Sequence, residues 1–202
     1  MRIAAIYSHK GGEKLIQTQY SEWLAEIVSV VESIDAEINR TKESKEKTMP
    51  GQMLFNPVTL NKGFKKRLAD LGWSSKRITI ETPDLGIGLS HTGFREVDFL
   101  KGDLGLEVQF GKYAFLVYDI ISKMVIFHRR GLLNAGIEIL PTKRMVGEMS
   151  SGIGHFEQVV ADLYHRGIAD LDVPVLILGI EPAYGANTAT TEGVKDIQPS
   201  LL

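Results

Sequence analysis

The sequence predicts an α/β fold in which a mixed central β-sheet is flanked by helices. From residue 95 onward, short apolar runs typical of strands alternate with longer segments typical of helices. The run 173–180 is almost continuously apolar, as expected for a strand that is covered on both faces. The chain of 202 residues has no internal repeat and no long linker, which favours one compact domain.

The first half of the chain is expected to form a strand at 3–7, a long helix after Gly12, a basic helix at 61–71 and a strand at 77–81. Asn61 is the expected N-cap of the basic helix, and Gly72 its left-handed C-terminal residue. The charged segment 40–48 is expected to be an exposed loop. The long helix is indicated by apolar residues at three- and four-residue spacing: Ile16, Tyr20, Trp23, Ile27, Val30, Ile34 and Ile38.

The second half is expected to form strands at 97–99, 104–110, 137–140 and 173–180, and helices at 113–127 and 154–166. After Pro182 the sequence becomes polar and rich in Gly, Thr and Asn. We therefore expect a single domain over residues 1–182 and a polar, partly disordered tail over residues 183–202.

Composition excludes several classes of protein. The 23 Lys and Arg nearly balance the 25 Asp and Glu, so a polyanion has to be met by a local patch rather than by overall charge. The absence of cysteine excludes disulfides, Cys-ligated zinc, iron–sulfur clusters and a thiol nucleophile. The longest apolar stretch, 114–127, is interrupted by Asp119 and Lys123 and falls short of the roughly 20 residues that span a bilayer. We expect a cytoplasmic protein with no membrane partner and no secretory signal.

A hairpin around Gly102-Asp103 is the most informative segment. This dipeptide lies between two runs of alternating apolar residues and predicts a two-residue turn that pairs Lys101 with Leu104. Counted outward from the turn, Phe99 faces Leu106 and Val97 faces Val108, which gives one apolar side for the core.

On the other side of this hairpin, Asp98 is expected opposite Glu107, and Glu96 opposite Gln109. Opposed carboxylates repel each other unless a cation neutralises them, and Mg²⁺ takes oxygen ligands of this kind together with water and phosphate. The spacing alone favours the solvated face of an ordinary amphipathic hairpin over a metal site, because acidic residues are common on exposed strand faces.

The pattern of Asp98, eight intervening residues and Glu107-Val108-Gln109 resembles the catalytic core of the PD-(D/E)xK nucleases. The strings Glu107-Val-Gln-Phe-Gly-Lys-Tyr-Ala-Phe115 and Glu148-Met-Ser-Ser-Gly152 are similar, more narrowly, to type II restriction endonucleases of the BglII and BstYI group. The segment 33–47 is also similar to the BstYI branch, so the resemblance spans most of residues 1–182.

This resemblance implies a restriction-endonuclease-like fold, a Mg²⁺ cofactor and double-stranded DNA as substrate. It implies that Asp98 and Glu107 hold the metal and that Gln109 positions the attacking water, at a place where most such nucleases carry lysine. A glutamine supplies no charge, so positive charge at the phosphate must come mainly from the metal. An upstream helper residue of the group stays unassigned.

The resemblance also assigns DNA contacts to Lys112, Ser150 and Ser151. The alternatives are that Lys112 touches only a phosphate and that the serines cap a helix beginning near Gly154. The substrate's symmetry implies a homodimer, and the group implies a six-base site, purine-GATC-pyrimidine, cut after the first purine. Two other interpretations are a structure-specific or repair nuclease and a sequence-specific DNA-binding protein without catalytic activity.

Overall fold

The computed structural model describes residues 1–86, 88–166 and 172–184. In these ranges the predicted mixed sheet is present, with six strands in the order β1-β8-β7-β6-β5-β4. Strands β6, β7 and β8 are parallel to each other, and the remaining neighbours are antiparallel. The strands are β1 (Arg2–His9), β4 (Ser74–Thr82), β5 (His91–Lys101), β6 (Leu104–Val108), β7 (Ala135–Pro141) and β8 (Val175–Glu181).

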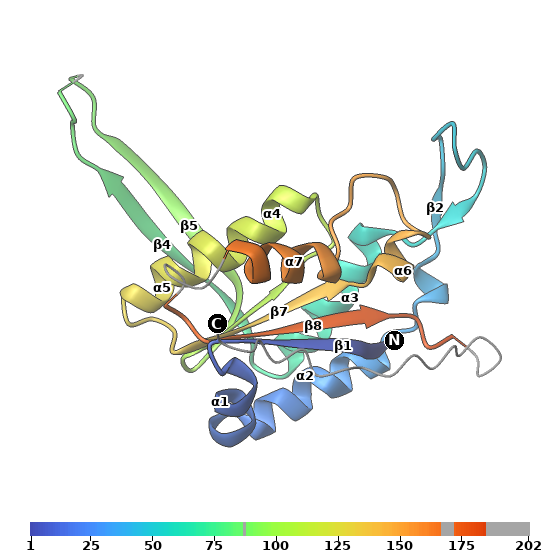
Figure 1. Ribbon diagram of the computed structural model, residues 1–202, viewed down its shortest axis with the longest axis horizontal. Coiled ribbons are helices and arrows are strands. Elements are labelled where there is room, and N and C mark those ends of the chain that lie inside the picture. Colours follow the sequence, from blue (N-terminus) through green and yellow to red (C-terminus); the bar gives the residue numbers. More distant parts are fainter. Residues whose placement is uncertain (87, 167–171, 185–202) are drawn as a thin grey trace.

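Helices cover both faces of the sheet (Figure 1). One core lies between the sheet and α1 (Gly12–Gln19), α2 (Ser21–Ser33), α3 (Pro57–Asp70) and α6 (Lys143–Val146). The other lies between the sheet and α7 (Phe156–Arg166) together with a continuous helical segment composed of α4 (Tyr113–Tyr118), η2 (Asp119–Met124) and α5 (Val125–Arg129). Strand β8 alternates between the two cores, since Leu176 packs in the first and Ile177 in the second. The predicted α/β fold is therefore confirmed. No helix within the described ranges is long and apolar enough to cross a membrane.

The long helix expected after Gly12 is two helices. The helix breaks at Tyr20, whose φ of −131° is not helical and whose hydroxyl donates a 2.9 Å hydrogen bond to Asp103. Helix α2 ends at Ser33 and is followed by a short turn, η1 (Glu37–Asn39). Ile38 lies in that turn and is 74% exposed, so its place in the predicted apolar stripe was wrong.

The structure also corrects two predictions for residues 40–72, the start of the basic helix and the exposed loop. Helix α3 begins four residues earlier than expected, because Asn56 caps it by accepting a hydrogen bond from the Val58 N–H and Pro57 follows in the first turn. Asn61 is thus inside the helix, whereas the left-handed Gly72 is confirmed, with φ +86°. The segment expected as a loop contains β2 (Lys42–Glu43), which pairs with β3 (Met53–Leu54).

Two arms project from the same side of the molecule (Figure 1). One is the long β4–β5 hairpin, and the other is the small β2–β3 hairpin. The N-terminal end of α4 and the loop between α6 and α7 lie between them (Figure 1). Residues 185–202, which make up nearly all of the expected tail, lie outside the described residues.

Candidate active site

The hairpin that carries the predicted carboxylates is β5–β6. Its register agrees with the prediction near the turn, where Lys101 pairs with Leu104 and Phe99 with Leu106. Within β5 and β6, the paired residues end at Phe99. Glu96 does not face Gln109 as expected, but pairs with Arg77 on β4 and forms an ion pair with it.

A β-bulge in β5 explains why the register stops agreeing. On the β4 side, Ser74 pairs with Leu100 but Lys76 pairs with Val97, so β5 has one extra residue in this interval. The bulge changes the face on which the preceding residues lie. Val97 therefore packs in the second core, and the prediction that it shares a face with Val108 was wrong.

Asp98 lies within this bulged segment and remains next to Glu107. The backbone N–H of Asp98 donates a 3.3 Å hydrogen bond to Oε1 of Glu107. The Asp98 side chain is exposed, but Glu107 is 0% exposed and its Oε2 has no hydrogen-bond partner among the described residues. A buried carboxylate with an unpaired oxygen is not part of a solvated hairpin face, so that interpretation is wrong for Glu107.

Two residues that were not predicted as site residues, Lys123 and Asp119, lie beside Glu107. Lys123 Nζ lies 2.8 Å from Glu107 Oε1 and 2.8 Å from Asp119 Oδ1. Asp119 in turn accepts a 3.1 Å hydrogen bond at Oδ2 from Gln109 Nε2. A continuous chain of polar contacts thus links Glu107 to Gln109. The signal for it was the pair of charges, four residues apart, that interrupts the apolar stretch 114–127.

Glu138 is a fourth carboxylate in this region. It pairs directly with Glu107 in the parallel register of β6 and β7, is fully buried, and has no partner for either side-chain oxygen among the described residues. Burial, followed by the charges of Asp119 and Glu107, raises its pKa well above the ordinary value. Glu138 is therefore protonated under conditions in which an exposed glutamate is charged.

The pKa values of Glu107 and Lys123 are also raised in this cluster. Burial raises the pKa of Glu107 well above its ordinary value and the Asp98 charge raises it further, whereas Lys123 opposes the rise. Burial alone would lower the pKa of Lys123, but the carboxylates of Glu107 and Asp119 outweigh it, so its pKa is raised. Lys123 is thus charged throughout the neutral range and is the cation of this cluster.

The oxygen atoms present suit a hard divalent cation that takes most of its ligands from elsewhere. Within the described ranges, no three His, Asp or Glu side chains are arranged as a ready metal cage. Glu107 Oε2, which has no partner among the described residues, and the exposed Asp98 carboxylate, whose charge acts on Glu107, nevertheless offer two carboxylate donors on neighbouring strands. Mg²⁺ commonly uses only one or two carboxylates, with waters and substrate phosphate as further ligands.

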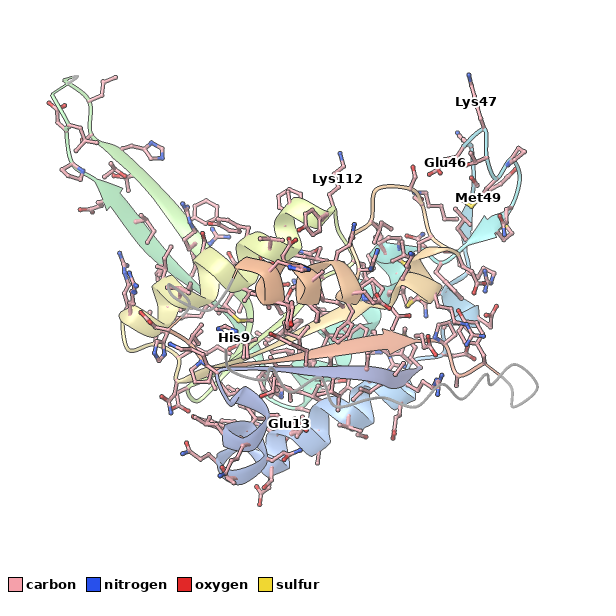
Figure 2. All side chains as sticks on the ribbon, in the orientation of Figure 1. His9, Glu13, Glu46, Lys47, Met49 and Lys112 are labelled. Atoms are coloured by element: carbon pink, nitrogen blue, oxygen red, sulfur yellow. The ribbon has the colours of Figure 1, made fainter. Side chains whose placement is uncertain are left out.

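Lys112, Ser150 and Ser151 lie on one surface. Lys112 precedes α4, is exposed, and projects between the two arms (Figure 2). Its backbone forms a β-bridge with Ile153, which connects it to the loop that carries both serines. Lys112 also follows Gln109 by three residues, so one short segment joins the buried carboxylate cluster to this surface.

The two serines contact the β2–β3 hairpin. Ser150 Oγ accepts a hydrogen bond from Lys42, and the Ser151 N–H donates to Glu46 at 2.9 Å. Helix α7 begins only at Phe156, so the alternative that these serines cap it is wrong. Glu46, Lys47 and Lys112 carry charges along the same edge of the molecule (Figure 2).

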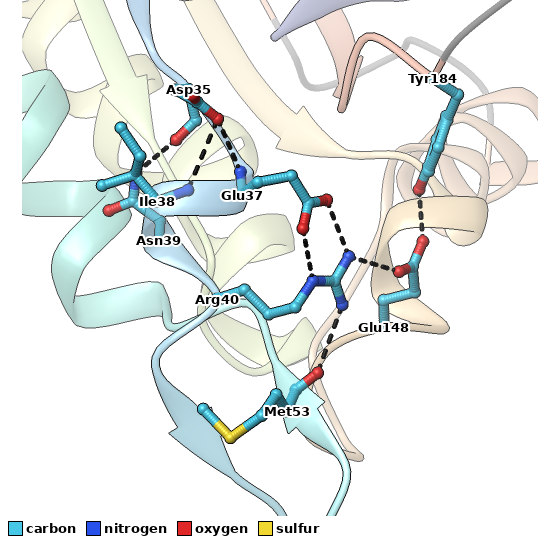
Figure 3. A network of polar contacts seen from close by, with 8 residues as sticks. All are labelled: Asp35, Glu37, Ile38, Asn39, Arg40, Met53, Glu148 and Tyr184. Carbon is cyan, nitrogen blue, oxygen red and sulfur yellow. Dashed lines mark hydrogen bonds and ion pairs between the residues drawn. The ribbon is translucent and has the colours of Figure 1, made fainter.

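A second polar network attaches this hairpin to the body of the protein (Figure 3). Arg40 forms ion pairs with Glu37 at 2.8 Å and with Glu148 at 2.7 Å, and it donates to the carbonyl of Met53. Tyr184 also donates to Glu148, at 2.7 Å. Because Glu148 begins the loop that carries the serines, Arg40 ties the β2–β3 hairpin and that loop together.

Comparisons with known proteins agree with this architecture. Residues 4–180 match the family described as Restriction endonuclease BglII/BglIII. A solved structure, described as the crystal structure of restriction endonuclease BglII complexed with a DNA 16-mer, has the same fold, with a TM-score of 0.67. Its sequence is 23% identical, and the match covers 89% of this chain and 76% of that one. No curated protein matches the sequence.

Proposed function

The chain belongs to the BglII/BglIII family of restriction endonucleases, which are site-specific deoxyribonucleases, and on this premise we propose a Mg²⁺-dependent active site at Asp98, Glu107 and Gln109. The observation that carries the proposal is the buried Glu107 carboxylate, whose Oε1 accepts from the Asp98 N–H and whose Oε2 has no hydrogen-bond partner among the described residues. A polar atom buried without a partner costs about 1–3 kcal/mol, and a cation ligand would remove that cost.

In the proposed mechanism, Asp98 and Glu107 would hold the Mg²⁺ ion. When bound, the ion supplies positive charge at the scissile phosphate and lowers the pKa of a bound water. Gln109 donates its amide N–H to Asp119, so its carbonyl oxygen is the group left to accept a hydrogen bond from the attacking water. Gln109 thereby orients the nucleophile, and the charge at the phosphate comes from elsewhere.

We propose that DNA lies along the surface between the two arms. Lys112, Ser150 and Ser151 lie on this surface, and Lys42 and Glu46 hold the serine loop from the β2–β3 side. A lysine can donate to guanine O6 and N7, and a serine hydroxyl can donate to N7, which guanine and adenine share. The resemblance to the BglII and BstYI group supports purine-GATC-pyrimidine as the proposed target, cut after the first purine to leave a four-base 5′ overhang, and a donor to N7 suits either outer purine.

A palindromic target requires one catalytic centre for each strand, so we propose that the protein acts as a homodimer. We further propose that it works in the cytoplasm, where the DNA substrate is available.

Digestion of a plasmid of known sequence, followed by sequencing of the ends, tests the proposal. We expect discrete fragments that depend on Mg²⁺ and end in 5′-GATC, with either purine before the cut. Ends without GATC, or cleavage at one fixed outer pair only, would contradict the target but not the family. Cleavage confined to branched or damaged DNA would indicate a structure-specific nuclease. Specific binding without cleavage would indicate an inactive DNA-binding protein.

A further inference from the structure

Lys123 is placed in the carboxylate cluster by an unusual helical segment. It lies in η2, a π-helical segment between α4 and α5, and such wide turns occur frequently at functional sites. The next residue, Met124, packs on Gly136 of β7 so closely that a Cβ there would come within 2.4 Å of its sulfur. This close approach brings the η2 segment against β7, which neighbours the strand that carries Glu107.

The ammonium of Lys123 occupies the space between two acidic side chains. It contacts Glu107 Oε1 and Asp119 Oδ1 at the same distance of 2.8 Å, and its side chain is only 11% exposed. The charge of Asp98 also acts on Glu107 and Asp119, and neither side-chain oxygen of the buried Glu138 has a partner among the described residues. In the absence of metal, Lys123 is therefore the positive charge that balances Glu107 and Asp119.

We propose that Lys123 is a resident counter-ion of the active site, which holds Glu107 and Asp119 in place before the metal arrives and competes with the metal for Glu107. This inference rests on the metal site proposed above. Because Lys123 already neutralises Glu107, the metal-free site attracts Mg²⁺ only weakly. Asp119 is a second ion-pair partner, so the Lys123 ammonium would stay in the site when Glu107 binds a metal ion.

The competition predicts opposite effects for two substitutions. Lys123→Met removes the competing cation, so Mg²⁺ should bind more tightly. Asp119→Asn leaves the ammonium with Glu107 as its one remaining ion-pair partner among the described residues and removes one negative charge, so Mg²⁺ should bind more weakly. A lysine with a merely structural role would leave the Mg²⁺ affinity of Lys123→Met unchanged.

Calorimetric titration with Mg²⁺ alone, without DNA, measures this competition independently of cleavage. We expect Lys123→Met to lower the Kd for Mg²⁺ about tenfold, and Asp119→Asn to raise it by a similar factor. The melting temperature in EDTA should fall in Lys123→Met, and added Mg²⁺ should raise it by more than in the wild type. If Lys123→Met does not fold, Lys123→Gln, which also removes the charge but keeps a polar side chain, takes its place in the titration.

A second lysine–carboxylate pair provides a matched control. Lys101 forms a partly buried ion pair with Glu26 at 2.7 Å, on a cluster that contains Trp23 and Trp73. Lys101→Met should therefore lower the melting temperature in EDTA but leave the Mg²⁺ affinity and the Mg²⁺-dependent rise as in the wild type.

A further variant separates the two proposals. If Asp98→Asn binds Mg²⁺ as tightly as the wild type, the proposed metal site is wrong and the role of Lys123 is wrong with it. If Asp98→Asn loses Mg²⁺ while Lys123→Met binds it like the wild type, the metal site stands and only the counter-ion is disproved.

Discussion

Glu107 and Glu138 are direct partners on the parallel strands β6 and β7, and both side chains are fully buried. Two charged carboxylates in this arrangement would repel each other strongly in a medium of low dielectric constant. Lys123 forms an ion pair with Glu107, whereas neither side-chain oxygen of Glu138 has a partner within the ranges that the structure describes. The two glutamates therefore differ in their surroundings: Glu107 has the Lys123 ammonium as a counter-charge, whereas Glu138 has no such partner among the described residues, and burial raises its pKa well above the ordinary value.

Glu138 is predicted to make the protein less stable as pH rises. Its pKa in the folded protein is raised above the unfolded value, so it contributes stability below about pH 4.5 that is lost as pH rises toward the folded pKa. Over that window the free energy of unfolding should fall by up to about 1.4 kcal/mol per pH unit from this group. Glu138→Gln cannot titrate, so urea unfolding in EDTA should show a flatter pH profile than the wild type. Parallel profiles would contradict a raised pKa at this position.

Removal of either proposed metal ligand should abolish cleavage. Asp98→Asn and Glu107→Gln keep the shape of each side chain but weaken its ability to hold a cation. We expect no detectable cutting of plasmid DNA, while a gel-shift assay shows specific DNA binding close to that of the wild type. Near-normal cleavage by either variant would place the metal elsewhere. Loss of both binding and cleavage would indicate misfolding, which circular dichroism would reveal.

The β5–β6 carboxylates could be found from sequence because a two-residue turn fixes register by itself. Once Gly102 and Asp103 are assigned to the turn, Lys101 must face Leu104. The bulge around Asp98 could not be predicted in this way, since it depends on pairing with β4, whose register no local pattern gives. As a result, the pairing predicted for Val97 failed.

The remainder of the cluster depends on packing that local patterns do not specify. The spacing of Asp119 and Lys123 indicates one helix face, but not the strand on which that face packs. Glu138 did offer a signal, because a charged residue within the apolar run 137–140 is unusual for a buried parallel strand. The break between α1 and α2 at Tyr20 had no such signal, because the apolar spacing continues through this residue. The contact that distinguishes Tyr20 is a hydrogen bond to Asp103, which is distant in the sequence.

Arg40 is predicted to stabilise the fold and to hold the β2–β3 hairpin. Its guanidinium pairs with Glu37 and Glu148 and lies 3.9 Å from the centre of the Phe55 ring. Arg40→Met should lower the free energy of unfolding by about 1–3 kcal/mol, the range for losing charged hydrogen bonds and a cation–π contact. The matched control is Glu37→Gln, whose side chain is 64% exposed and whose loss should cost well under about 1 kcal/mol. Equal effects of the two substitutions would contradict a central role for Arg40.

Lys112 is predicted to read a base rather than only a phosphate. A lost base contact should relax the choice of base at one position of the target, at a cost of about 1–3 kcal/mol there. A lost phosphate contact would instead weaken binding to every sequence equally and reduce the salt dependence by one charge. Cleavage of a panel of single-base variants by Lys112→Met, at several salt concentrations, separates the two outcomes. Uniform weakening across the panel would assign Lys112 to the phosphate backbone.

Gln109 is predicted to act through its position, and Gly111 provides a way to move it. A Cβ at Gly111 would come within 2.6 Å of Gln109 Oε1, and because that atom ends a flexible side chain, the glutamine should shift while the fold persists. Gln109→Ala should slow single-turnover cleavage by on the order of 10²-fold, the usual cost of losing one positioned polar group. Gly111→Ala should slow cleavage in the same direction, with a melting temperature close to that of the wild type. In the double variant the glutamine is absent, so the added methyl group should have little further effect on the rate. Multiplicative losses in the double variant would mean that Gly111 acts on cleavage by another route.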